Sequence, residues 1–186
     1  MSSVTALIPA AGASRRLGQP KQLVPLDGEP LVHRAARLAR EAGCARVLVV
    51  EGAVPLREVL SDLAVEVVRC EGWAAGPGAS LRAGAARLGE GEAALVWLVD
   101  QWALGVKELE ALLRAPGEVA AAHYAGGLGV PARFGPRFTH VLRALPDDAG
   151  AKGWLRANAA LVTAVPMPEA EQDLDTPAQL AATRGP

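Results

Sequence analysis

Short runs that are apolar at nearly every position recur along the chain, separated by segments of a different periodicity. A continuous apolar run is typical of a strand covered on both faces, as in a parallel sheet between two layers of helices. The runs that we interpret as strands are Val4–Pro9, Arg46–Glu51, Val65–Arg69, Ala93–Val99, Glu118–Tyr124 and Ala160–Pro166.

The segments between these runs have the periodicity of amphipathic helices. In Pro30–Ala42 apolar residues recur on one face, Pro30 suits a helix start and Gly43 suits its end. Alternating strands and helices are the signature of a doubly wound α/β fold with right-handed crossovers. We therefore predict a single Rossmann-like domain over residues 1–186, with a mostly parallel sheet and helices on both faces. The other predicted helices are Ser80–Leu88, Val106–Leu113 and Pro136–Leu145.

Composition and charge indicate which cellular compartment and which classes of binding partner to expect. The formal net charge is −1 and no run of like charge stands out, so nucleic acid and membranes are not expected partners. The longest apolar stretch is far shorter than the roughly 20 residues of a membrane helix, and the first residues lack a signal-peptide pattern. A cytoplasmic protein is the expectation. Cys44 and Cys70 fit neither a zinc site nor a disulfide framework, and we expect buried thiols.

The loop after the first strand combines small residues with positive charge. Ligands of doubly wound sheets bind beyond the carboxyl ends of the strands, and this loop, from Ala10 to Lys21, lies at such an end. Small side chains let backbone amides approach a phosphate, and Arg15, Arg16 and Lys21 can neutralise it. The loop matches neither the dinucleotide-binding G-x-G-x-x-G pattern nor the P-loop. It predicts a polyphosphate site, with an ordinary basic turn as the alternative.

The same segment resembles the signature of the molybdenum cofactor cytidylyl- and guanylyltransferases, L-A-A-G-x-S-x-R-M-G-x-x-K. Here it reads P-A-A-G-A-S-R-R-L-G-Q-P-K, so only Pro9 and Leu17 depart from it. The resemblance extends along the chain, which makes it far more specific than one loop. The further segments that resemble the family are Leu23–Leu31, Gly72–Leu88, Leu98–Gln101, Gly126–Pro131, Asp148–Lys152 and Asp173–Pro177.

This resemblance implies a nucleotide-diphospho-sugar-transferase-like fold and a nucleotidyl transfer. A phosphate of the acceptor, most simply a molybdopterin cofactor, attacks the α-phosphorus of a nucleoside triphosphate, and pyrophosphate leaves. Arg16 and the loop amides are expected to hold the outer phosphates, and Lys21 the α-phosphate. A transient contact with an apo-molybdoenzyme is implied as well. The loop residues expected to bind nucleotide are Ala10, Ala11, Gly12, Ala13 and Ser14.

Carboxylates at two places suit a metal ion. Asp100 follows the most hydrophobic predicted strand, where a buried carboxylate needs a cation or a hydrogen-bond donor nearby. Mg²⁺ is commonly held by one or two carboxylates together with substrate phosphates. The resemblance makes Asp100 one metal ligand and Asp175 the second, with Asp173 as the alternative. Two alternatives remain open. Asp100 is then a cap of the turn that follows its strand, and Asp175 or Thr176 is the N-cap of a last helix that starts at Pro177.

The nucleotide base is less well defined by the sequence. Ser80 follows the glycine-rich stretch that begins at Gly76. One interpretation is that Ser80 is a helix N-cap. The resemblance implies instead that Ser80, together with backbone groups near Gly76, recognises the nucleotide base. Ala11 leaves less room for a purine than glycine does, which favours the cytidylyl branch and CTP. GTP stays as the alternative.

The acceptor side departs from the family pattern. Trp102, Val130 and Lys152 stand where the family has proline, histidine and arginine, and lysine cannot reproduce a bidentate arginine contact. The acceptor is therefore open. One alternative is a methylerythritol-pathway cytidylyltransferase, which the chain resembles in the first loop while lacking its H-D-A-A-R-P stretch. The other is a non-catalytic nucleotide sensor or cofactor chaperone.

Overall fold

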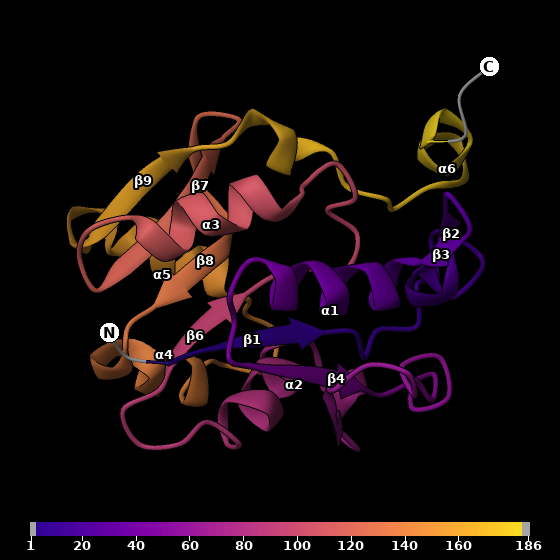
Figure 1. Ribbon diagram of the computed structural model, residues 1–186, viewed down its shortest axis with the longest axis horizontal. Helices are drawn as coiled ribbons and strands as arrows, with labels where there is room; N and C mark the ends of the chain where they lie inside the picture. Colours follow the sequence, from indigo (N-terminus) through magenta and orange to yellow (C-terminus); the bar gives the residue numbers. More distant parts are fainter. Residues whose placement is uncertain (1–2, 184–186) are drawn as a thin grey trace.

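A seven-stranded sheet runs through the middle of the protein in the computed structural model, which describes residues 3–183 (Figure 1). Its strand order is β5-β4-β1-β6-β8-β7-β9. Among these strands β8 is antiparallel to both of its neighbours, and the other pairs are parallel. The predicted mostly parallel sheet is therefore confirmed. The strands are β1 Val4–Pro9, β4 Arg46–Glu51, β5 Glu66–Arg69, β6 Ala93–Val96, β7 Val119–Tyr124, β8 Gly127–Phe134 and β9 Val162–Pro166.

Helices cover both faces of the sheet, as predicted. Helices α1 and α3 lie on one face, and α2 and α4 lie on the other (Figure 1). Along β1, Ala6 and Ile8 pack into the first layer, whereas Leu7 between them packs into the second. Because both faces are covered, every position of such a strand is apolar. The helices are α1 Leu31–Glu41, α2 Pro77–Ala85, α3 Val106–Arg114, α4 Thr139–Arg143, α5 Ala151–Ala157 and α6 Pro177–Thr183.

Short 3₁₀ turns and a small hairpin connect these elements. The hairpin pairs β2 Pro25–Leu26 with β3 Glu29–Pro30, and its two turn residues, Asp27 and Gly28, both have positive φ, of 51° and 84°. Positive φ at both central residues gives a turn whose twist matches that of the strands. The 3₁₀ segments are η1 Lys21–Leu23, η2 Trp73–Ala75, η3 Pro136–Phe138, η4 Ala159–Leu161 and η5 Pro168–Glu171.

Strand β8 was not predicted from the sequence, and two predicted strands exceed the observed ones by more than one residue. Gly127, Gly129 and Pro131 break the apolar pattern of β8, although the strand lies inside the sheet between β6 and β7. The predicted strand Ala93–Val99 ends at Val96, and its chain then turns so that Gln101 N donates to Leu98 O over 3.4 Å. The predicted strand Ala160–Pro166 begins at Val162, after η4.

Two predicted helices have the wrong bounds, and α5 was not predicted. The predicted helix Ser80–Leu88 begins at Pro77, with Gly76 as the N-cap, so the N-cap interpretation of Ser80 is wrong. Proline has no amide hydrogen to leave unpaired, which suits it to this first helical position. The predicted helix Pro136–Leu145 divides into η3 and the short α4.

The remaining expectations for helices and cysteines agree with the structure. Pro30 precedes α1, and Gly43 after it has a φ of 103°. Cys44 and Cys70 are buried free thiols, and burial raises the pKa of Cys44 to about 12. Between residues 3 and 183, every helix is too short or too polar to cross a membrane.

His33 of α1 contacts two carboxylates, and these contacts should make the stability of the protein depend on pH. His33 Nδ1 lies 2.7 Å from Glu29 Oε1, and His33 Nε2 lies 3.0 Å from Asp62 Oδ2. Burial tends to lower the pKa of His33, but the two carboxylates outweigh it and raise that pKa above its ordinary value of 6.5. The stabilisation is therefore fully present below the ordinary pKa and is lost as the pH rises through the raised one.

Urea unfolding over a range of pH tests this linkage. As the pH rises through the raised pKa of His33, we expect the free energy of unfolding of the wild type to decrease. The free energy of unfolding of His33→Gln should not show this decrease. His140→Gln changes an exposed histidine and serves as the control. Identical pH dependence of the wild type and His33→Gln would contradict the ion pairing.

Candidate functional site

The loop from Ala10 to Pro20 follows β1 at the carboxyl edge of the sheet. Its start is fixed by the neighbouring strand, since Ala10 N donates to Val50 O over 2.9 Å and Ala53 N donates to Ala11 O over 2.9 Å. Further along, Lys21 N donates to Ser14 Oγ over 3.0 Å, which draws the two ends of the loop together. Ser14 has a φ of 52° at the bend. The small residues of the sequence motif therefore form a tight turn.

Gln22 is the residue that fixes this turn, and sequence reasoning missed it. Its side chain is 1% exposed, and Nε2 donates to Ala10 O over 2.6 Å and to Gly12 O over 2.7 Å. With two carbonyls held inward, the loop presents its other side to solvent. A signal was present in the sequence, because a glutamine directly follows Lys21, but nothing local showed that it is buried.

Replacing Gln22 with leucine tests this role. The change leaves two loop carbonyls without their donor, which should lower the free energy of unfolding by about 1–3 kcal/mol. We also expect nucleoside triphosphate affinity to fall by about tenfold, because the loop would lose its fixed shape. Gln172→Leu, at an exposed position, is the matched control. Calorimetric titration and denaturant unfolding measure both effects; unchanged affinity in Gln22→Leu would show that the loop holds its shape without Gln22.

Several backbone amides of the loop are free to donate. In the part of the chain that the structure describes, the amides of residues 11–16 donate to no protein acceptor. Successive free amides in a turn form a concave site for an anion. Of the loop residues expected to bind nucleotide, Ala11 to Ser14 therefore have free donors for phosphates, whereas the Ala10 amide donates to Val50 O.

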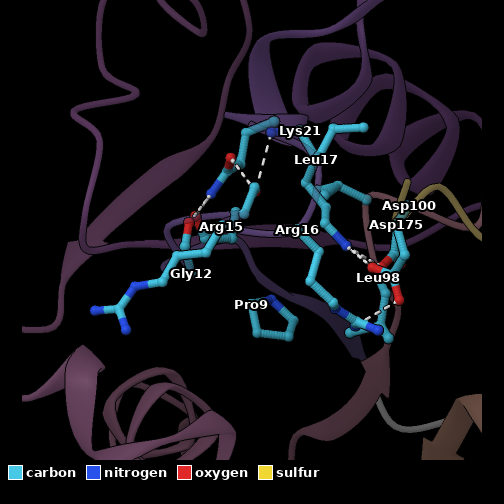
Figure 2. Close-up of a pocket in the computed structure, with 13 residues that line it drawn as sticks. Pro9, Gly12, Arg15, Arg16, Leu17, Lys21, Leu98, Asp100 and Asp175 are labelled. Carbon is cyan, nitrogen blue, oxygen red and sulfur yellow. Dashed lines mark hydrogen bonds and ion pairs between the residues drawn. The ribbon is translucent and has the colours of Figure 1, made fainter. Parts of the chain in front are cut away.

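Two basic residues of the loop reach across to two carboxylates from distant parts of the chain. Lys21 Nζ lies 2.8 Å from Asp100 Oδ2 and 2.5 Å from Asp175 Oδ1, and Arg16 Nη2 lies 2.7 Å from Asp175 Oδ2. Figure 2 shows both basic side chains pointing toward the carboxylates, while Arg15 points away from them. The structure thus brings together Arg16, Lys21, Asp100 and Asp175, the four charged residues expected from the sequence.

Asp100 has the chemistry of a ligand that needs a cation. Burial raises the pKa of Asp100, and the nearby Lys21 ammonium offsets only part of that rise. Within residues 3–183, Asp100 Oδ1 is buried and has no hydrogen-bond partner. Buried polar atoms are nearly always satisfied, so an orphaned carboxylate oxygen suits a bound cation or donor. The turn-capping alternative for Asp100 finds no such bond in this structure.

Asp175 shares Lys21 with Asp100, whereas Asp173, the alternative ligand, does not contact Lys21. Burial acts to raise the pKa of Asp175, but Lys21 and Arg16 together hold it below its ordinary value. Asp173 is exposed and interacts with Gln179 Nε2 over 3.4 Å. Thr176 Oγ1 accepts from Gln179 N, and Gln179 Oε1 accepts from Thr176 N, so Thr176 caps α6 and leaves Asp175 free to face Lys21.

The donor set fits a divalent ion that is shared with substrate. No group of three or more histidine, cysteine or acidic residues suitable for a metal occurs among the described residues. Two carboxylates completed by phosphate oxygens are the arrangement that Mg²⁺ commonly adopts. Asp100 and Asp175 therefore fit the metal expected from the sequence, provided that a polyphosphate supplies further oxygens.

Two cavities meet at the loop. The first, of about 330 Å³, contains Arg16, Lys21, Asp100 and Asp175. The second, of about 380 Å³, lies on the other side of the loop toward α2. Both are lined by Pro9, Gly12, Arg15 and Leu98, so they adjoin.

The second cavity has an aromatic wall that sequence reasoning did not assign. It is lined by Trp73, Gly76 and Ser80 as well as by the loop. Gly52 makes room for the indole, because a Cβ there would lie 2.6 Å from Trp73 Cγ. Ser80 lies inside α2, and its hydroxyl makes no hydrogen bond to a protein group within residues 3–183. An aromatic face and a free hydroxyl are the groups that a nucleotide base would use.

The three residues that depart from the family pattern lie away from both cavities. Trp102 packs against the core, and Val130 O accepts from Gln101 Nε2 over 2.7 Å. Lys152 Nζ lies 6.0 Å from the centre of the Tyr124 ring. Neither cavity is lined by any of the three.

Known proteins share both the sequence pattern and the fold. The model of the MobA-like NTP transferase domain matches residues 6–163. The chain is 32% identical, over 95% of its length and 94% of the relative's, to the nicotine blue oxidoreductase of Paenarthrobacter nicotinovorans. It is 39% identical to a probable molybdenum cofactor guanylyltransferase of Opitutus terrae, over 44% of this chain and 39% of that protein.

Solved structures show the same architecture. The crystal structure of Rv0371c from Mycobacterium tuberculosis H37Rv superposes with a TM-score of 0.83 and 26% identity, covering 97% of each chain. The same mycobacterial protein has been solved in complex with manganese, with a TM-score of 0.81 and 22% identity over 98% of this chain and 97% of that one. Since the family model matches most of the sequence and the fold agrees, the chain belongs to the MobA-like NTP transferase family.

Proposed function

We propose that the protein transfers CMP from CTP to a phosphate-bearing acceptor, a molybdopterin-type cofactor, and releases pyrophosphate. The observation that carries this proposal is that the loop with free amides at residues 11–16 adjoins the Lys21–Asp100–Asp175 cluster, and that Gly12 and Ser14 line the same cavity as this cluster. A triphosphate needs hydrogen-bond donors, which the loop amides supply, and a divalent ion, which Asp100 and Asp175 can hold. The adjoining cavity gives its base a place to bind.

The reaction assigns a role to each side chain. An acceptor phosphate oxygen attacks the α-phosphorus, and the bond to the oxygen that bridges to the β-phosphate breaks, so that oxygen leaves with the electron pair as part of pyrophosphate. Arg16 and the loop amides bind the departing β- and γ-phosphates. Lys21 binds the α-phosphate, where positioning and charge stabilisation do most of the catalysis. Mg²⁺ held by Asp100 and Asp175 would supply further neutralisation of phosphate charge.

The choice of CTP rests on the cavity beside Trp73. Ala11 and Ala13 line that cavity, at positions where glycine would leave more room. A pyrimidine needs less room than a purine, so the small ring is favoured. Transfer of GMP from GTP to the same acceptor is the alternative within this family.

A second candidate, a nucleotide-dependent reduction, comes from the whole-length relative that is named an oxidoreductase. The pyrophosphate of a nicotinamide dinucleotide could occupy the same free amides. This reaction would not require Asp100 and Asp175 to share a metal, so the two carboxylates favour nucleotidyl transfer.

A panel of substrates distinguishes these functions. The protein is incubated with Mg²⁺, molybdopterin and each of the four nucleoside triphosphates, and pyrophosphate is measured. We expect release with CTP, whereas release with GTP would assign the guanylyl branch. Methylerythritol phosphate as acceptor, and reduction of a dye by NADH or NADPH, test the other activities. Tight CTP binding without turnover on any acceptor would exclude the proposed enzyme and leave a nucleotide sensor or chaperone.

A further inference from the structure

Lys21 occupies the position between the two carboxylates that would bind a metal. Its ammonium contacts Asp100 Oδ2 at 2.8 Å and Asp175 Oδ1 at 2.5 Å, and all three side chains are largely buried (Figure 2). The same oxygens are the ligands that a divalent ion needs. An ammonium and a metal ion therefore compete for one pair of carboxylates in this protein.

We propose that Lys21 is an exchangeable counter-ion: it holds Asp100 and Asp175 in the ligand-free protein and moves to the triphosphate when the nucleotide binds, which frees both carboxylates for the metal. The movement involves the side chain alone, because Lys21 N stays bonded to Ser14 Oγ in the loop. A lysine has the flexible stem that such a movement requires. The phosphate end of this exchange rests on the proposed function; the carboxylate end does not.

The contacts of the two carboxylates differ in a way that fits this exchange. Asp175 also contacts Arg16 at 2.7 Å, so Asp175 has two cationic partners in the ligand-free protein. In the described part of the chain Lys21 is the cation that contacts Asp100. A buried carboxylate without a partner is strongly unfavourable, so Lys21 can leave Asp100 only as another cation arrives. Nucleotide and metal binding are thereby coupled through one side chain.

This exchange predicts an opposite effect of one substitution on two ligands. Lys21→Met removes a phosphate contact, so nucleotide binding should weaken. It also removes the competing charge, so the two carboxylates should bind a divalent ion more tightly when no nucleotide is present. A lysine that acted only on phosphate would not produce the gain in metal affinity.

The test is a titration with Mn²⁺ alone, followed by electron paramagnetic resonance of the free ion. We expect Lys21→Met to bind Mn²⁺ at least about tenfold more tightly than the wild type, the size of effect typical for close charge pairs. Lys21→Arg keeps the charge and should show no gain, and Lys107→Met, at an exposed lysine of α3, should match the wild type. Equal or weaker Mn²⁺ binding in Lys21→Met would overturn the counter-ion role.

Two further measurements keep the result interpretable. Circular dichroism shows whether Lys21→Met is folded; if it is not, Lys21→Gln, which retains a polar group for the carboxylates, carries the same expectation. Calorimetry of the wild type with Mg²⁺ and each triphosphate tests the proposed function separately. Failure of every triphosphate to bind would reject the nucleotide part, whereas the Mn²⁺ titration, which contains no nucleotide, decides the counter-ion role by itself.

Discussion

Asp100→Asn is expected to slow pyrophosphate release from CTP by on the order of 10³-fold, because it removes charge from the two carboxylates that we propose as metal ligands. Asparagine has nearly the same shape, so the surrounding core and the turn after β6 should be retained. The measurement is the initial rate of pyrophosphate formation at saturating Mg²⁺ and CTP. Asp27→Asn, at an exposed turn position of the β2–β3 hairpin, is the matched control and should keep the wild-type rate.

The stability of the same variant separates a catalytic defect from a structural one. Burial raises the pKa of Asp100, which means that its charged form is disfavoured in the folded protein. A neutral asparagine avoids that cost, so the free energy of unfolding should be equal to or greater than that of the wild type. An Asp100→Asn protein that is stable and still fully active would contradict the assigned role of Asp100.

Gly78→Ala is expected to lower the free energy of unfolding by about 3 kcal/mol or more, at the upper end of what overpacking a close contact costs. A Cβ at this position would lie 1.7 Å from Pro146 O and 2.9 Å from Ala149 O. Gly78 N also donates to Asp147 O over 2.9 Å, so the start of α2 cannot move away without losing a hydrogen bond. Urea unfolding measures the loss.

Gly72→Ala is the matched control for this effect. It lies in the same glycine-rich segment, has a φ of −84°, and a Cβ there would meet nothing within 4 Å. Its stability should stay near that of the wild type. Equal loss in Gly72→Ala and Gly78→Ala would mean that glycine flexibility, rather than the contact of α2 with residues 146–149, determines the stability of this segment.

The sheet was predictable where local pattern and tertiary environment agree. Strand β1 is apolar throughout because helices cover both of its faces, and that pattern is visible in the sequence. Strand β8 also lies inside the sheet, between β6 and β7, but its residue at position 129 is determined by a neighbouring strand. A Cβ at Gly129 would lie 2.4 Å from Tyr124 Oη, a contact across the β7–β8 pair that no local pattern reveals.

In the candidate site, too, some features were predictable from the sequence and others were not. Residues that carry a recognisable motif, such as Lys21 and Asp100, were placed by the sequence. Their mutual contact joins positions 79 residues apart, and the Lys21–Asp175 contact joins positions 154 apart, so the sequence could not show that these groups bind each other. Gln22 was missed for a related reason, since its function depends on burial beneath a loop rather than on its residue type.

Labelled substrate tests the proposed transfer of CMP most directly. The protein is incubated with Mg²⁺, molybdopterin and CTP labelled at the α-phosphorus, and the products are separated. We expect the label to appear in the molybdopterin fraction in equal amount to the pyrophosphate released, and we expect Asp100→Asn to abolish both. Label that remains in CTP, or that appears only as free CMP, would contradict it.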